Sequence, residues 1–213
     1  DDIRGFFQGE GLITPGDYRY IGMGASRISW NGTTFIVEEG YGNHPVTGVT
    51  LIGAQSFAKH YGLRLPTSEE WEKAARGIND WTYPLGLGQN DSTATNFWNS
   101  GDPFDNGTTP VGFYNGSVQN GYQTLDSPSD YGAYDMAGNV SEWTQTPAIN
   151  NPDANYIRRG GTWRWNVWDA NFTRWDEPWF DNVEDTQGFR CVRDISTARA
   201  QWLLEKQRRR QAK

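Results

Sequence analysis

The sequence predicts a loop-rich α+β domain with two main helices and short antiparallel strands. Two segments combine apolar residues at helical spacing with residues that start and stop helices, and an Asn-Gly pair separates two β-type runs. Gly, Asn, Asp, Ser and Thr are abundant, and the 11 tryptophans supply large side chains for a core among loops. With 213 residues, the chain is long enough for one large domain.

A β-hairpin is expected around Asn31-Gly32, which lies between Arg27–Trp30 and Thr33–Val37. Both turn residues tolerate the positive φ angles that a tight hairpin needs. Two later strands are expected at Arg159–Trp163 and Gly188–Arg193. Between the helices and these strands, residues 79–125 are expected to be mostly loop, because Gly, Asn, Asp, Ser and Pro dominate there.

The two helices are bounded by side chains that can bond to free backbone groups. Thr50 is the expected N-cap of the first helix, and Gly62 ends it. Thr67 and Glu70 predict a capping box at the start of the second helix, and Gly77 ends it. The apolar faces comprise Ala54, Phe57, Ala58 and Tyr61 in the first helix, and Trp71, Ala74 and Ala75 in the second.

The formal net charge of −7 argues against nucleic acid as a partner, and no apolar run is long enough to span a membrane. Positive charge gathers after Ser196, in a basic helix or tail that is expected to follow a single domain at residues 1–195. One interpretation is an anchor that docks on a neighbouring subunit or an acidic surface, and a solvated helix is the alternative. The anchor residues would be Trp202, Arg208, Arg209 and Arg210.

The stretch YGAYDMAGNVSEWT, residues 131–144, concentrates turn residues, acids and aromatics. Asp135 and Glu142 flank the turn pair Gly138-Asn139. A chain that folds back here brings both carboxylates and the intervening carbonyls around one point, which is how oxygen ligands enclose calcium. The alternative is a solvated turn whose acids cap backbone amides.

This stretch resembles the signature of the formylglycine-generating-enzyme, or sulfatase-modifying-factor, family. The resemblance covers residues 45–194 and implies a C-type-lectin-like fold. It also implies a structural calcium ion held by the Asp135 and Glu142 side chains and the Gly138 and Val140 carbonyls. A second calcium site is implied around Asn96. The acid that completes this site in the family has no match here, and Asp102 or Asp105 would replace it. The implied site residues are Asn96, Phe97, Asp102 and Asp105. Four more stretches match in the family's order, namely RLPTSEEWEKAARG (64–77), TNFW (95–98), RRGGTW (158–163) and GFRCVRD (188–194).

The resemblance does not extend to the family's catalytic cysteines. Enzymes of this family bind copper through two cysteines after the Gly-Gly-Ser/Thr motif, and those positions fall at Trp165 and Ala170 here. The one cysteine, Cys191, lies on the closing strand and is expected to pack in the core. A second branch of the family holds iron with three histidines, whereas this chain has only His44 and His60. We therefore expect no copper site and no formylglycine-generating activity, with a divergent metal-dependent oxidoreductase that uses other ligands as the alternative.

The segment that replaces the catalytic loop is rich in tryptophan and arginine, which dominate binding hot spots. Tryptophan beside Asn and Asp also suits stacking on sugar rings. We expect a non-catalytic binding or structural module for a protein or glycan ligand, in a surface or extracellular assembly such as an envelope or virion exterior. Because loop-rich domains need large core residues, about half of the aromatic rings in this segment are expected to be buried. The predicted binding face is Arg164, Trp165, Trp168, Arg174, Trp175 and Trp179.

Overall fold

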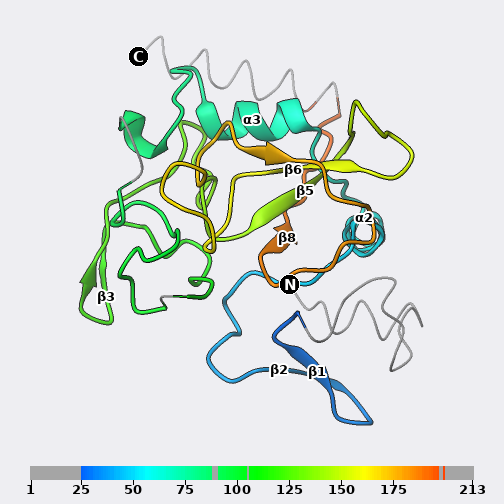
Figure 1. Cartoon of the computed structure of the whole chain (residues 1–213), viewed down its shortest axis with the longest axis horizontal. Helices are drawn as coiled ribbons and strands as arrows, with labels where there is room; N and C mark the ends of the chain where they lie inside the picture. The colour runs from blue at the N-terminus through cyan, green and yellow to red at the C-terminus, as the bar shows by residue number, and fades with distance from the viewer. Residues whose placement is uncertain (1–24, 88–90, 105, 197–198, 200–213) are drawn as a thin grey trace.

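The computed structural model describes residues 25–87, 91–104, 106–196 and 199, and it has the expected α+β architecture (Figure 1). Its centre is a four-stranded sheet in the order β7-β6-β5-β8. The strand β5 (Ser141–Pro147) pairs antiparallel with β6 (Tyr156–Arg159), which pairs antiparallel with β7 (Trp175–Asp176). The last strand, β8 (Gln187–Phe189), pairs in parallel with β5, so the sheet is mixed rather than wholly antiparallel.

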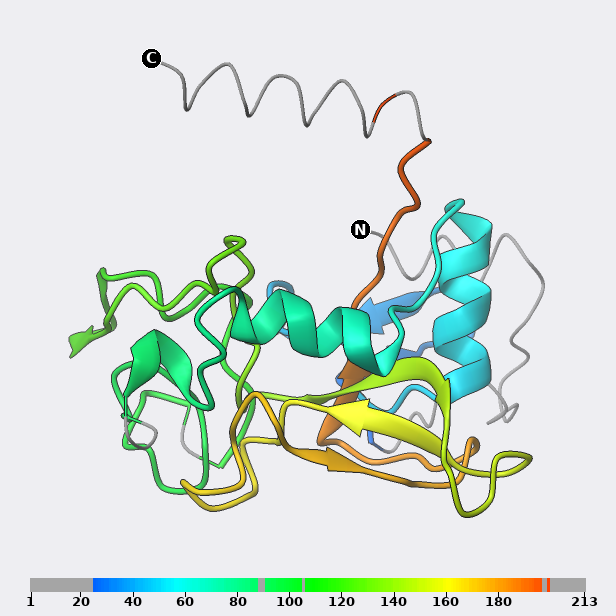
Figure 2. The same cartoon turned by 90° about the horizontal axis from the view of Figure 1, so that it is seen from above.

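Both expected helices are present with their expected caps. Helix α2 (Leu51–His60) begins after Thr50, whose side chain accepts a hydrogen bond from a backbone amide of the first turn. Helix α3 (Ser68–Arg76) begins after Thr67 and has the complete capping box with Glu70. Helix α3 packs against β5 and β6, and Figures 1 and 2 show it running alongside β6, so it covers part of the sheet.

Short hairpins complete the described elements. The hairpin predicted around Asn31-Gly32 is confirmed. The Asn31 Oδ1 accepts hydrogen bonds from the Thr33 and Thr34 amides, both at 2.9 Å. A second hairpin and a 3₁₀ turn lie in the long loop region after α3. The bounds are β1 Ile28–Trp30, β2 Phe35–Val37, η1 Pro84–Gly86, β3 Val118–Gln119 and β4 Tyr122–Gln123.

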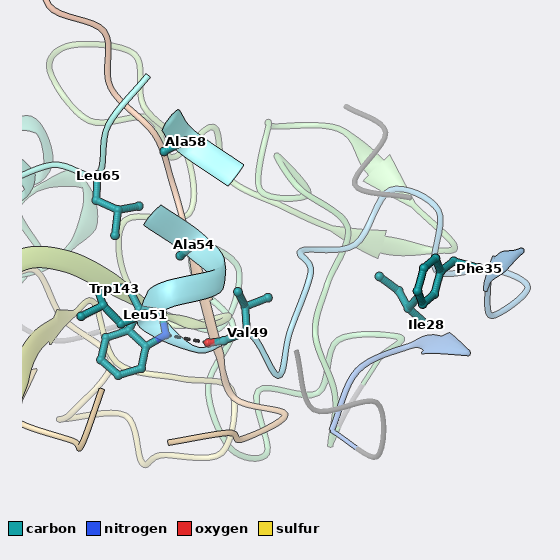
Figure 3. Packing of buried hydrophobic residues seen from close by; sticks show 8 residues of the cluster. All are labelled: Ile28, Phe35, Val49, Leu51, Ala54, Ala58, Leu65 and Trp143. Atoms are coloured by element: carbon teal, nitrogen blue, oxygen red, sulfur yellow. Dashed lines mark hydrogen bonds between the residues drawn. The ribbon is translucent and has the colours of Figure 1, made fainter. Parts of the chain in front are cut away.

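The core between α2 and the sheet is built around Trp143, whose side chain is fully buried. The Trp143 Nε1 donates a hydrogen bond to the Val49 carbonyl oxygen at 2.7 Å, which ties β5 to the start of α2 (Figure 3). Gln187 of β8 donates to the same oxygen at 3.1 Å. Cys191 packs against this cluster, as expected. Figure 3 shows Ile28 and Phe35 together on the hairpin, away from the other residues of the cluster. The buried members of the cluster are Ile28, Phe35, Val49, Leu51, Ala54, Ala58, Leu65 and Trp143.

The strand expected at Arg159–Trp163 is wrong in its extent. Strand β6 ends at Arg159, because Gly160 and Gly161 have φ angles of 100° and 76°, in the left-handed region that interrupts an extended strand. A Cβ atom on Gly161 would lie 2.5 Å from the Asp169 carbonyl oxygen, so two loop segments approach closely here. The glycine pair therefore leads the chain out of the sheet.

Several predicted residues lie outside the described part of the chain. They are the anchor residues Trp202, Arg208, Arg209 and Arg210, and Asp105 of the second calcium site. Among the helices of the described ranges, none is long and apolar enough to cross a membrane.

Candidate functional site

Residues 131–144, which we call the turn, comprise an irregular loop over residues 131–140 and the first four residues of β5. Asp135, Gly138 and Asn139 have positive φ angles of 57°, 70° and 59°. The Gly138 amide donates to the Gly160 carbonyl oxygen at 2.8 Å, and the Asn139 amide donates to the Asn96 carbonyl oxygen at 3.0 Å. A Cβ atom on Gly138 would lie 1.9 Å from that Asn96 oxygen, so only glycine fits. The turn is thus fixed between two other loops.

Glu142, the second residue of β5, is 5% exposed, and its carboxylate accepts hydrogen bonds from three N–H groups. The Trp71 Nε1 donates to Glu142 Oε2 at 2.6 Å. The Arg190 guanidinium binds both carboxylate oxygens, through Nε to Oε2 and through Nη2 to Oε1 at 2.6 Å. This two-point contact between a guanidinium and a carboxylate is among the stronger polar interactions in proteins.

Asp135 lies beside the same guanidinium. The Arg190 Nη2 also donates to the carbonyl oxygens of Tyr134 and Asp135, at 3.1 and 3.2 Å. The Asp135 Oδ2 accepts a hydrogen bond from the Gly112 amide at 2.7 Å. Burial raises the pKa of the Asp135 carboxyl above its usual value, although the Gly112 hydrogen bond and the Arg190 charge oppose the rise.

The predicted calcium ligands Asp135, Gly138, Val140 and Glu142 therefore share one turn, and Arg190 lies against both acidic residues. The turn offers carboxylate and carbonyl oxygens, the ligand types that calcium prefers. However, the Glu142 oxygens accept N–H groups from a cation, which would repel a metal ion placed beside it. The residues fit calcium only if Arg190 moves away from Glu142, and calcium binding stays a prediction.

The residues of the predicted second calcium site have separate partners. The Asn96 Nδ2 donates to the Gly107 carbonyl oxygen at 3.0 Å. The Phe97 carbonyl oxygen accepts the Ser100 amide at 3.1 Å. The buried Asp102 carboxylate accepts the Phe104 amide and the Ser100 hydroxyl, both at 2.7 Å. In this arrangement Asp102 caps its own loop, and the second site also stays a prediction.

A shallow cleft of about 960 Å³, open to solvent, includes Trp165, one of the two positions that match cysteines in the resemblance. Three tryptophans form its walls, and amide, carboxylate and guanidinium groups lie between them. Its lining residues are Trp98, Asn106, Trp163, Arg164, Trp165, Asn166, Asp169 and Arg174.

The cleft is attached to the turn through backbone hydrogen bonds. The Trp98 amide donates to the Trp165 carbonyl oxygen at 2.8 Å, so these two tryptophans meet although they are distant in sequence. The Trp163 amide donates to the Asn139 carbonyl oxygen, also at 2.8 Å. The cleft is therefore held in place by the turn at residues 131–144.

The two arginines of the cleft stack on its tryptophans. The Arg164 guanidinium carbon lies 4.7 Å from the centre of the Trp163 ring, and Arg164 Nη2 pairs with Asp185 at 2.7 Å. The Arg174 guanidinium carbon lies 4.7 Å from the centre of the Trp165 ring, and Arg174 Nη1 lies 3.5 Å from Asp169 Oδ1. Stacking of this kind fixes the plane of each guanidinium.

The structure divides the predicted binding face. Arg164, Trp165 and Arg174 line the cleft, whereas Trp168, Trp175 and Trp179 are exposed but are not among its lining residues. Residues 164–187 contain six large aromatic rings, of which Phe172 is buried, Trp165 and Phe180 are half-buried, and Trp168, Trp175 and Trp179 are exposed. The expectation that about half of these rings are buried therefore holds only if the two half-buried rings are included. The sequence analysis missed Trp98, Asn106, Trp163, Asn166 and Asp169 as members of the face, although the TNFW and RRGGTW stretches contain the two tryptophans.

Trp165 and Ala170 stand at the two positions that match the family's cysteine pair, and they differ in burial. Trp165 is half-buried and lines the cleft, whereas Ala170 is fully buried. The one cysteine, Cys191, borders a separate cavity of about 1300 Å³ that also includes Asp135 and Arg190. Burial raises the pKa of the Cys191 thiol to about 11, so the thiolate is scarce at neutral pH.

Comparison with known proteins identifies the family and the fold of this chain. Residues 8–195 match the family described as Sulfatase-modifying factor enzyme 1-like domain. The chain is 35% identical over 187 residues to the serine/threonine-protein kinase Pkn1 of Chlamydia trachomatis serovar L2, covering 80% of this chain and 27% of that protein. It is 35% identical over 120 residues to the Inactive C-alpha-formylglycine-generating enzyme 2 of Bos taurus, covering 56% of this chain and 38% of that protein. The structure of PvdO from Pseudomonas aeruginosa has a TM-score of 0.61 at 17% identity, covering 90% of this chain and 77% of that one.

The fold is thus the C-type-lectin-like fold of formylglycine-generating enzymes, as predicted. The chain belongs to the sulfatase-modifying-factor, or formylglycine-generating-enzyme, family and lacks its catalytic cysteine pair. It spans 27% of the length of the chlamydial relative and 38% of the bovine one.

Proposed function

We propose that this chain is a non-catalytic ligand-binding module and that the tryptophan cleft is its binding site. The observation that carries the proposal is the replacement at the two cysteine positions. Copper chemistry in this family needs a pair of soft thiolates. Here Trp165 forms a wall of the cleft, and Ala170 places a methyl group inside the packed interior. An aromatic binding surface has replaced the metal ligands.

The lining of the cleft favours a glycan. Trp98 is 51% exposed and offers a ring on which the C–H face of a sugar can stack. Asn106, Asn166 and Asp169 lie beside the rings and can exchange hydrogen bonds with hydroxyl groups. A protein ligand is the second candidate, because Trp and Arg also dominate protein-binding hot spots.

Two relatives support the proposal. The bovine relative is named as inactive, so the family includes proteins that carry that description. The matched part of the chlamydial relative is 27% of that protein, which supports a domain that works within a larger chain. An extracellular or surface location is part of the same proposal, because recognition of glycans or partner proteins is a frequent task there.

Binding to a glycan library tests the proposal. We expect at least one glycan to bind the wild-type chain, and Trp98→Ala to weaken that binding at least about tenfold through loss of stacking. Tyr131→Ala is the matched control, since Tyr131 is 57% exposed and does not line the cleft. Equal binding by wild type and Trp98→Ala would place the site elsewhere. Stoichiometric copper(I) binding with oxygen consumption in the presence of a thiol peptide would contradict the non-catalytic assignment.

Assembly through the basic tail is a separate proposal. The native mass of the protein from its source, with and without residues 196–213, tests it directly. A large assembly that the truncation dissolves would support an anchoring tail. An unchanged monomeric mass would contradict it.

A further inference from the structure

Arg174 is a cation of the cleft whose hydrogen-bonding capacity is only partly used by the described residues. Its guanidinium carbon lies over the Trp165 ring at 4.7 Å from the ring centre, and Asp169, with which it pairs, is 3.5 Å away, beyond the usual hydrogen-bond distance. The Arg174 Nε is buried and has no hydrogen-bond partner among the described residues. The side chain as a whole is 42% exposed, so its outer N–H groups remain accessible from the cleft.

Arg164 provides a comparison within the same cleft. It stacks on Trp163 at the same distance, 4.7 Å, but its Nη2 is bonded to Asp185 at 2.7 Å. Arg164 therefore already has a carboxylate partner within the same chain. Arg174 lies over the Trp165 ring, and its contact with Asp169 is longer. A planar guanidinium in this state matches a carboxylate through two parallel hydrogen bonds.

The charge of the cleft points the same way. Two arginines and one aspartate line it, and Asp185 pairs with Arg164, so the formal charges balance and Arg174 is the loosely paired cation. An anionic ligand can form charge-assisted hydrogen bonds with this guanidinium, which a neutral sugar cannot match.

We infer that the ligand is an acidic sugar, whose ring stacks on the tryptophans while its carboxylate binds the Arg174 guanidinium. This inference rests on the proposed glycan-binding function of the cleft. Asp169 limits the site, because its carboxylate competes with the ligand for the same guanidinium. The Asn166 Nδ2 donates to Asp169 Oδ2 at 2.7 Å, which holds this competing acid in place.

The test uses trigalacturonic acid and its methyl ester, which share their rings and differ in charge. We expect the acid to bind the wild-type chain at least about tenfold more tightly than the ester, because charge-assisted hydrogen bonds are about twice as strong as neutral ones. Arg174→Gln should abolish this preference, because it weakens binding of the acid more than binding of the ester. Arg27→Gln is the control, because Arg27 also stacks on an aromatic ring, Tyr41, and pairs with an acid, but lies on the hairpin.

A variant with the opposite expected effect guards against loss of folding. Asp169→Asn removes the competing carboxylate, so it should raise the preference for the acid over the ester further. Equal binding of acid and ester, with both lost in Trp98→Ala, would overturn the acidic-ligand inference and keep the glycan function. Failure of both sugars and of the wider glycan library to bind would overturn the proposed function itself. Arg174-dependent binding of an acidic peptide, with neither sugar bound, would also overturn the inference.

Discussion

Replacing Glu142 by glutamine tests whether the contact with Arg190 holds the turn at residues 131–144 to the end of the sheet. Glutamine keeps the size of the side chain and one carbonyl oxygen. It removes the negative charge and directs an NH₂ group towards a site that contains only donors, from Trp71 and Arg190. One donor then loses its acceptor, and the guanidinium loses its counter-ion.

The expected loss of stability follows from the burial of the two partners. Breaking a buried ion pair by removing one charge costs about 3–5 kcal/mol. The Glu142 side chain is 6% exposed, but the Arg190 side chain is 29% exposed and keeps some contact with water. We therefore expect the lower limit, about 3 kcal/mol. For a chain of this size, 1 kcal/mol corresponds to about 2–4 °C, so the Tm should fall by about 6–12 °C.

Thermal unfolding followed by circular dichroism measures this effect. Glu38→Gln provides the control, because the Arg27–Glu38 pair has side chains that are 46% and 52% exposed. Such a surface pair contributes at most about 1 kcal/mol. If Glu142→Gln lowers the Tm no more than the control does, the Arg190 contact does not stabilise the turn and our reasoning is refuted.

Three further perturbations have defined outcomes. If the turn binds calcium, excess calcium at about 100 times its Kd should add about 2.7 kcal/mol to the unfolding free energy of the wild type. It should add nothing to that of Asp135→Ala. Equal Tm values with calcium and with chelator would contradict the site. Gly138→Ala places a Cβ atom 1.9 Å from the Asn96 carbonyl oxygen and should lower the free energy of unfolding in urea by about 3 kcal/mol or more. Gly132 also has a positive φ angle, but a Cβ atom there would meet nothing within 4 Å. Gly132→Ala should therefore lower the free energy of unfolding by only about 1–2 kcal/mol. Hydrogen bonds from Arg64 and the Thr67 amide lower the pKa of Glu70 from 4.5 to about 2. Its stabilising contribution, about 1 kcal/mol at this exposed position, is therefore complete above pH 4.5 and is lost as the pH falls towards 2. Glu70→Gln should remove that part of the acid dependence of Tm, and an unchanged profile would contradict the assignment.

The sequence predicted those features that depend on neighbouring residues. The capping box of Thr67 and Glu70 and the hairpin at Asn31-Gly32 are each determined within a few residues, so their patterns are specific. The same local reasoning misplaced the strand at Arg159–Trp163. It could not show that both glycines adopt positive φ, because Gly160 lies against Trp71 and Gly161 against the loop at Asp169, and both contacts are distant in sequence.

The cleft and the partner of Glu142 depend on contacts between distant segments, which periodicity does not reveal. Trp98 and Trp165 meet through one backbone hydrogen bond between two irregular loops. Arg190 was visible in the GFRCVRD stretch, but spacing alone does not show that the chain after β8 brings it to Glu142. Composition assigned Trp168, Trp175 and Trp179 to the predicted binding face, but it could not show which tryptophans are exposed or that these three lie outside the cleft.

The position of β8 has a consequence for how the chain folds during synthesis. Gln187 bonds to the Val49 carbonyl oxygen, 138 residues earlier, and Val192 forms a bridge with Arg64. At a synthesis rate of about 5–20 residues per second, α2 leaves the ribosome on the order of 10 s before the strand that completes its core. During that interval the apolar face of α2 and the edge of β5 lack their final partners. A chain stalled before Gln187 is therefore a substrate for chaperones and proteases rather than a smaller folded domain.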